Sequence, residues 1–184
     1  MRKRPNRPID KSLLDNIFEE GLDLDALDTP ERIVAYCRDK GFYNGNATNI
    51  QELIEDNPKL NLEFQDIGKF DAFIEKTNAD CFRIVINKRH SATRQRFSMA
   101  HEYIHYQFHR KEIEEMPRGE RIMHRGDELN RIEYQANQNA AEVLMPDPDF
   151  RQVTHAKNGD ISAVAKEFKV SLLAVRYRAK SLGI

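Results

Sequence analysis

The chain has 184 residues, a length that suits one domain or one domain with a small appendage. Its 40% hydrophobic and 32% charged residues are ordinary for a soluble globular protein and exclude an extensively disordered chain. The net charge of −1 conceals basic ends, because residues 1–9 carry four Lys or Arg and no acidic residue, and residues 151–184 carry seven against two acidic residues. Basic ends on an acidic body indicate separate roles for the ends, although solvated charged faces are a common cause of such runs.

The cysteines and the hydropathy pattern predict a cytoplasmic protein. Cys37 and Cys81 are isolated and form no CxxC pair, so we expect a reducing compartment, buried or idle thiols and no cysteine metal site. The basic N-terminus leads into Pro5 and Pro8 and lacks the apolar stretch of a signal peptide. No run approaches the roughly 18 apolar residues that cross a bilayer, so we expect no membrane partner.

The first third of the chain is predicted to be helical. Residues 10–20 place Leu and Ile side chains on one side of a short amphipathic helix. Thr29 followed by Pro30 is typical of a helix start, and Asn49 is a candidate cap for a further short helix. We therefore predict an N-terminal helical segment over residues 1–58.

Strands are predicted next, followed by a longer helix. Residues 60–64 alternate with period two, and residues 70–75 and 81–87 flank a turn at residues 77–80. We expect these strands to form a small antiparallel three-stranded sheet that leads directly into a helix over residues 94–109.

The last third of the chain is predicted to be helical again. Residues 111–126 read as a loop or broken helix, and a helix over residues 127–145 ends at Pro146. Residues 147–149 are then expected to be a hinge to two short basic helices. The predicted fold class is α+β, with a core at residues 59–148 and a C-terminal helix-turn-helix-like segment at 149–184.

The most informative motif is His101-Glu102-Tyr103-Ile104-His105, an H-E-x-x-H pattern inside the predicted helix. Positions four apart return to the same helix face, so the imidazoles of His101 and His105 can grip one zinc ion. Glu102 lies near the same rim and is the candidate general base for a water on that metal. The alternative is that both histidines are hydrogen-bonded core residues, which is the common situation for a single histidine.

A catalytic zinc ion needs a third protein ligand and an open position. His109 cannot be this ligand, because it lies two turns, about 12 Å, from His101 along the helix. The extended metzincin pattern requires a third histidine six residues after the second, but this chain has Lys111 at that position. His90 lies in a predicted loop and stays an alternative that no pattern favours.

Glu133 is the better third ligand. It begins a helical stripe of mostly small residues, which includes Ala136 and Ala140 and would let this helix approach the motif helix closely. Asn137, one turn after Glu133, is placed to accept a hydrogen bond from the outer N–H of a ligating histidine. The alternative for Glu133 alone is an ordinary surface carboxylate.

Two segments resemble signatures of the ImmA/IrrE family of zinc metallo-endopeptidases. Residues 96–109, RFSMAHEYIHYQFH, are similar to the family pattern R-F-T-x-A-H-E-x-x-H, and residues 133–146, EYQANQNAAEVLMP, are similar to E-x-x-A-N-x-F-A-A-x-x-L-M-P. The resemblance covers about residues 70–184. It departs at Ile104, where the family usually has Gly, and at Asn139, where it usually has Phe.

The resemblance implies that His101, His105 and Glu133 bind Zn²⁺ and that Glu102 is the general base. It also implies that residues 59–148 form a zincin-like metalloprotease core. For the group that stabilises the oxyanion, the candidates are three side chains near the second signature: Tyr134, His124 and Arg125. We expect an extended substrate to add as a strand to an edge of the sheet at residues 81–87.

The basic C-terminal stretch resembles a helix-turn-helix. Ala165 and Phe168 would pack the first helix, Ser171 would cap the second, and Val175 would face inward. Exposed basic side chains on the second helix are then candidate contacts for nucleic acid or for a protein partner: Arg176, Arg178 and Lys180.

Three functions are compatible with these patterns. The leading hypothesis is a zinc endopeptidase that cleaves a helix-turn-helix transcriptional repressor, the target that the resemblance implies. The second is a DNA-binding regulator whose metal site is degenerate or structural, and the third is a toxin or partner-binding module of a two-gene cassette.

Overall fold

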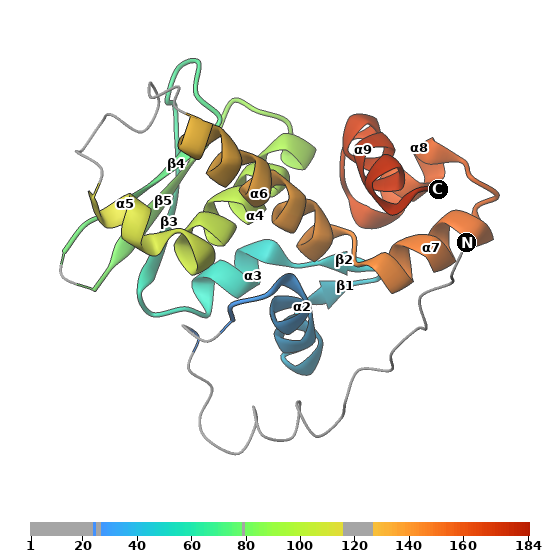
Figure 1. Cartoon of the computed structure of the whole chain (residues 1–184), viewed down its shortest axis with the longest axis horizontal. Coiled ribbons are helices and arrows are strands. Elements are labelled where there is room, and N and C mark those ends of the chain that lie inside the picture. The colour runs from blue at the N-terminus through green and yellow to red at the C-terminus, as the bar shows by residue number, and fades with distance from the viewer. Residues whose placement is uncertain (1–23, 25–26, 79, 116–126) are drawn as a thin grey trace.

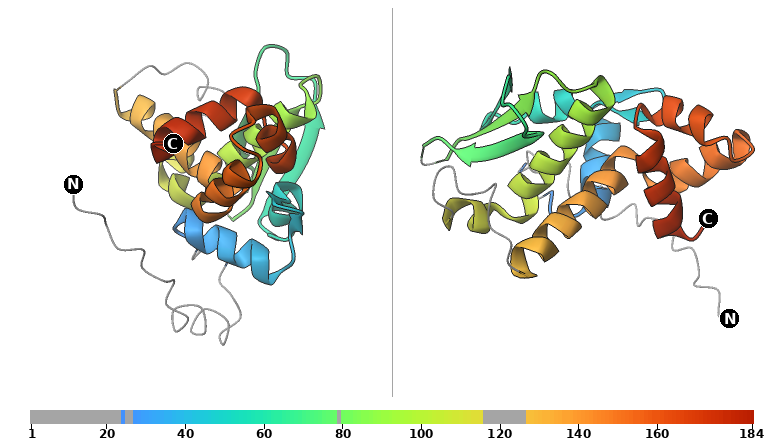
Figure 2. Two further views of the ribbon diagram at one scale, coloured as in Figure 1. Left: turned by 90° about the vertical axis from the view of Figure 1, so that its right-hand side faces the viewer. Right: turned by 90° about the horizontal axis from the view of Figure 1, so that it is seen from above.

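Helix α4 (Ala92–Phe108) runs through the centre of the computed structural model, which describes residues 24, 27–78, 80–115 and 127–184 (Figure 1). A small sheet covers one side of α4 and helix α6 (Asp127–Leu144) packs along another (Figure 2). This architecture agrees with the predicted α+β class. The helix predicted at residues 10–20 lies outside the described residues.

The sheet contains β3 (Leu60–Gln65), β4 (Ala72–Lys76) and β5 (Phe82–Asn87) in the order β3-β5-β4. Strands β4 and β5 form the predicted antiparallel hairpin, and Thr77 N donates to Cys81 O across its turn at 2.9 Å. The predicted all-antiparallel sheet is wrong, however, because β3 pairs with β5 in parallel.

The mixed sheet follows from the position of β5. Its sequence, Phe-Arg-Ile-Val-Ile-Asn, is buried at almost every position instead of alternating, as expected of a central strand with both faces covered. Strand β4 occupies one side of β5, so β3 pairs on the other side. The connection between β3 and β4 is only residues 66–71, so the chain reverses direction there, and β5, which returns antiparallel to β4, runs parallel to β3.

Helix α4 is buried on most of its circumference. Ala100, Tyr103, Ile104 and Tyr106 are fully buried although they point in different directions around the helix axis. Such a helix needs cover on several sides, and the sheet and α6 provide it. The polar side chains that α4 carries in its middle are therefore held in a packed environment.

Helix α6 confirms the predicted helix over residues 127–145 to within one residue. Ala136 and Ala140 are fully buried on the face that contacts α4, which is the close approach expected of small side chains. Helix α5 (Arg110–Glu115) follows α4 and accounts for part of the stretch predicted as a loop or broken helix. Residues 116–126 lie outside the described residues.

The N-terminal elements pack against this centre. Helix α2 (Pro30–Asp39) begins as predicted, with Thr29 Oγ1 accepting from Arg32 N at 3.3 Å, and α3 (Ile50–Glu55) follows Asn49. Between them lies a short hairpin that sequence analysis missed, with β1 (Tyr43–Asn44) and β2 (Ala47–Thr48) joined through Gly45 at φ +65°. Its two loop residues, Gly45 and Asn46, are a Gly-Asn pair, which is a hairpin signal.

The two cysteines differ in their surroundings. Cys37 on α2 is fully buried, and this burial raises the pKa of its thiol to about 12. Cys81 is partly exposed at the start of the β5 hairpin strand. Only the first therefore agrees with the expectation of a buried thiol, and both are free.

The C-terminal region contains three helices, α7 (Asp147–Ala156), α8 (Ile161–Phe168) and α9 (Leu172–Leu182). The expected hinge at residues 147–149 is wrong, because these residues form the first turn of α7 with Pro148 in a position that needs no N–H donor. The helix pair α8–α9 matches the predicted turn, with Lys169 left-handed at φ +54° and Ser171 Oγ accepting from Ala174 N at 3.1 Å.

One hydrophobic cluster extends from Leu27 to Val175 and includes side chains from all three predicted segments. The division of the chain at residues 58 and 148 stays a prediction. Every helix in the described part of the chain is too short or too polar to span a membrane.

Arg178 fastens α9 to the end of α6. It is only 5% exposed, its Nε donates to Met145 O at 2.9 Å, and its guanidinium pairs with Glu142. Glu142 also accepts from Asp147 N at 3.3 Å at the start of α7. The predicted exposure of Arg178 is therefore wrong, because Val175 three residues earlier faces the core and the two positions share a helix face.

We expect Arg178→Ala to lower the free energy of unfolding by about 2–3 kcal/mol, since it removes the cationic partner of the Glu142 carboxylate and the side-chain donor to Met145 O. The value lies below that of a fully buried pair because the Glu142 side chain is 23% exposed. Urea unfolding measures the change. Arg176→Ala, on the exposed side of the same helix, is the matched control and is expected to change stability by less than about 0.5 kcal/mol. Equal losses in both variants would contradict the anchoring role.

Candidate metal centre

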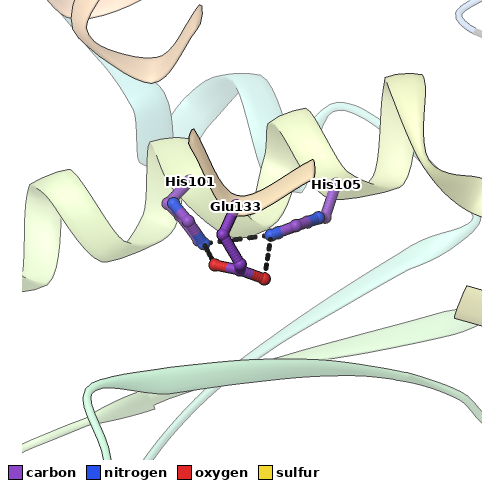
Figure 3. A group of neighbouring side chains, drawn as sticks. All are labelled: His101, His105 and Glu133. Carbon is purple, nitrogen blue, oxygen red and sulfur yellow. Dashed lines mark hydrogen bonds and ion pairs between the residues drawn. The ribbon is translucent and has the colours of Figure 1, made fainter. Parts of the chain in front are cut away.

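The motif histidines and Glu133 meet between α4 and α6. His101 Nε2 and His105 Nε2 lie 3.0 Å apart, and the Glu133 carboxylate oxygens lie 3.1 Å from the first nitrogen and 3.2 Å from the second (Figure 3). Helical spacing places the two rings one turn apart on α4, and the close approach of α6 brings Glu133 to them. Within the described residues these three form the group of His, Cys, Asp and Glu side chains that can hold a metal ion.

The three donor atoms fit a zinc ion. Zinc binds imidazole nitrogen and carboxylate oxygen at about 2.0–2.2 Å, and a tetrahedral arrangement then separates neighbouring donor atoms by about 3.3 Å. The nitrogen–nitrogen distance of 3.0 Å and the nitrogen–oxygen distances of 3.1 and 3.2 Å, each to a different oxygen of Glu133, are close to this value. Two nitrogens and one carboxylate also match the set that catalytic zinc sites use, and they leave one position open.

The orientation of His101 supports a metal-binding lone pair on its inner nitrogen. His101 Nδ1 lies 3.1 Å from Asn137 Oδ1, which is the neighbour expected from the sequence. Because an amide oxygen accepts, Nδ1 carries the proton and Nε2 is left as an acceptor that points at the cluster centre.

The charges within the cluster favour an ionised ligand. Burial opposes ionisation of Glu133, but its contacts with the imidazoles of His101 and His105 outweigh burial and hold the pKa of this carboxyl well below its usual range. For His101, burial acts to lower the pKa, and the hydrogen bond with Glu133 together with the nearby carboxylates outweighs burial and raises it. Glu133 is therefore a carboxylate at neutral pH, as a metal ligand must be.

His109 lies against the outer side of His105, a contact that sequence analysis missed because it considered His109 only as a direct ligand. The Nδ1 atoms of the two rings are 3.2 Å apart, and His109 is 4% exposed. Burial, and then the neighbouring His105, lower the pKa of His109. The sequence does contain a signal for this contact, because His109 follows His105 by the same four residues that separate His105 from His101. His90 is placed elsewhere, with its Nδ1 3.1 Å from Asp71 Oδ1.

A cavity of about 460 Å³ opens beside the cluster. Its walls come from β4 and the residues before it, from α4 and α5, and from the first half of α6. Glu102 lines this cavity next to His101 and is 8% exposed, whereas the Glu133 side chain is 54% exposed. The cluster therefore faces a space large enough for part of a peptide, with a carboxylate at its wall.

The sheet edge beside the cavity is β4. Ala72, Phe73 and Ile74 of this strand line the cavity, and β4 is an edge strand in the order β3-β5-β4. The expectation that a substrate adds to residues 81–87 is wrong, because β5 already has a neighbour on each side.

The remaining predicted positions lie away from the cavity or outside the described residues. Tyr134 is 66% exposed and does not line the cavity, and His124 and Arg125 fall outside the described residues, so the oxyanion-stabilising role of all three stays a prediction. The two departures from the family pattern do not line the cavity either. Ile104 is fully buried and Asn139 is half-buried.

An α+β fold with a His-His-Glu cluster in a cavity defines the class of a candidate metallopeptidase. The sequence matches the family model Peptidase_M78, described as the IrrE N-terminal-like domain, over residues 61–180. This match covers more than half of the chain, and the protein belongs to this family, as the ImmA/IrrE resemblance predicts.

No curated protein matches the chain. Among solved structures, the chain is similar to a Mycobacterium tuberculosis transcriptional regulator, with a TM-score of 0.59 and 16% sequence identity. The similarity covers 85% of this chain and 46% of the regulator, so the chain spans less than half of that protein's length. At this identity the likeness concerns the fold alone.

Proposed function

We propose that the protein is a zinc-dependent endopeptidase in which His101, His105 and Glu133 bind Zn²⁺. The observation that carries this proposal is the meeting of one ligand atom from each of the three side chains within 4.8 Å of one another, beside a cavity that Glu102 lines. Membership of a peptidase family supports the same activity.

The residues around the cavity have separable roles in peptide hydrolysis. A bound zinc ion supplies Lewis acidity, because it lowers the pKa of a water molecule toward about 7 and polarises the scissile carbonyl. Glu102 accepts a proton from the attacking water and passes it to the leaving amine. The free edge of β4 aligns the substrate as an added strand through backbone hydrogen bonds. Asn137 holds His101 in the tautomer that presents Nε2.

The substrate that we propose is a helix-turn-helix transcriptional repressor, and limited cleavage would relieve repression. Family membership supports this choice. The test is incubation of the zinc-loaded protein with the repressor encoded beside its gene, with products identified by mass spectrometry. We expect one or a few cuts with the wild type and none with His101→Ala. A repressor left intact by the zinc-loaded wild type would contradict this substrate.

A second candidate function is a regulator that binds a partner through α9. Arg176 and Lys180 are exposed there, and so are Leu173 at 58% and Tyr177 at 64%. Exposed apolar side chains beside basic ones favour a protein partner, such as the other member of a two-gene cassette, over DNA alone. Binding to duplex DNA with a steep salt dependence by a protein that holds no metal would favour the DNA-binding alternative.

The proposal also covers the cellular location of the protein and the roles of its two larger segments. The isolated Cys37 and Cys81 support a cytoplasmic location. We assign the chemistry to residues 59–148 and partner contacts to residues 149–184.

A further inference from the structure

The outer nitrogen of His105 contacts a second buried histidine instead of a carbonyl or an amide. His109 ends α4, its backbone N–H donates to His105 O at 3.0 Å, and its ring lies 5.1 Å from the His105 ring between centroids. The mechanism described above gives His109 no role. Its ring is nevertheless held on both sides, because it is buried and each ring nitrogen has a partner.

Gln135 determines which nitrogen donates in each of these histidine contacts. Gln135 Oε1 lies 3.4 Å from His109 Nε2, and an amide oxygen only accepts, so Nε2 of His109 carries the proton. A neutral imidazole with its proton on Nε2 offers Nδ1 as an acceptor. That Nδ1 lies 3.2 Å from His105 Nδ1, which must therefore donate.

The consequence reaches the metal centre. With its proton on Nδ1, His105 has its lone pair on Nε2, the atom that faces His101 Nε2 and Glu133. The opposite tautomer would point an N–H at the place where a cation must bind. The contacts from Gln135 through His109 therefore orient the lone pair of His105. Asn137 orients that of His101 in the same way.

We propose that His109, supported by Gln135, is a positioning residue that holds His105 in the tautomer able to bind metal and so sets the metal affinity of the centre. The inference rests on the proposed zinc site. Partners that orient a ligating histidine typically change metal affinity by about 10–100-fold when they are removed.

The test compares zinc dissociation constants measured by competition with a chelator. His109→Leu fills similar space but cannot accept, so we expect affinity to fall by about 10–100-fold. His109→Asn places an amide oxygen where Nδ1 was and is expected to restore affinity close to that of the wild type. His155→Leu makes the same change at an exposed histidine of α7 and should leave affinity unchanged.

The rescue by Asn separates positioning from packing. Equal affinities in the Leu and Asn variants, whether both weak or both like the wild type, would overturn the proposal. Melting temperatures show whether each variant folds. If the Leu variant does not fold, Gln135→Leu tests the same chain from the exposed surface of α6, and an unchanged affinity there would also overturn it.

Cleavage does not enter this comparison. A wild type that binds zinc but cuts no peptide would contradict the protease, while the order of affinities would still decide the role of His109. A wild type that binds no zinc would contradict both.

Discussion

Glu102→Gln is expected to bind zinc as tightly as the wild type and to lose peptide cleavage by at least about 100-fold, and up to about 10⁴-fold. Glu102 lines the cavity but is not one of the three clustered donors, so its loss removes a proton acceptor and leaves the metal ligands in place. An amide of the same shape cannot take a proton from the attacking water.

The measurement is a pair of assays on the same preparation, zinc content and the rate of peptide cleavage. Glu52→Gln makes the same chemical change on the exposed surface of α3, away from the cavity, and should leave both values unchanged. A Glu102→Gln variant that cleaves at the wild-type rate would show that another group acts as the base.

Glu133→Ala is expected to lose both zinc and cleavage. Among the described residues its carboxylate is one of three clustered donors, and its removal leaves two imidazoles, which together bind zinc more weakly. We expect zinc affinity to fall by more than the roughly 10–100-fold that is typical of residues behind the ligands.

Chelator competition measures this loss, and cleavage at saturating zinc shows whether activity returns when the ion is forced into the site. Glu52→Ala is the matched control. Retention of wild-type zinc affinity by Glu133→Ala would mean that a different side chain completes the centre and would exclude Glu133 as the third ligand. Together with Glu102→Gln, this variant separates loss of the metal from loss of the base.

Periodic patterns predicted the elements that carry the centre. The four-residue spacing of His101 and His105 and the small residues after Glu133 identified two helices that must lie close together, and α4 and α6 do so. The β4–β5 hairpin followed from its turn residues in the same way. These features depend on contacts between residues near in sequence, or on one strongly patterned face.

Features that depend on distant neighbours were predicted less well. The parallel pairing of β3 with β5 depends on which side of β5 the hairpin leaves free, and no local pattern records that choice. The burial of Arg178 depends on Glu142 and on a carbonyl at the end of α6. The sequence predicts an exposed arginine because charged side chains are usually exposed, but an arginine that is paired with a carboxylate can be buried.

The family signatures point to the three candidate ligands but not to His109. Ligand spacing identifies side chains that can reach the metal. His109 is not one of them, because it does not belong to the cluster of three. Its contact is with the far nitrogen of His105, and only the packed end of α4 shows that the two rings meet.

The most direct test of the whole account is an anomalous-scattering map from a crystal of the zinc-loaded protein. We predict a single zinc peak about 2.0–2.2 Å from Nε2 of His101, Nε2 of His105 and a carboxylate oxygen of Glu133, with Glu102 outside bonding distance. A peak that lacks Glu133, a peak elsewhere in the protein, or no peak after loading would contradict the account.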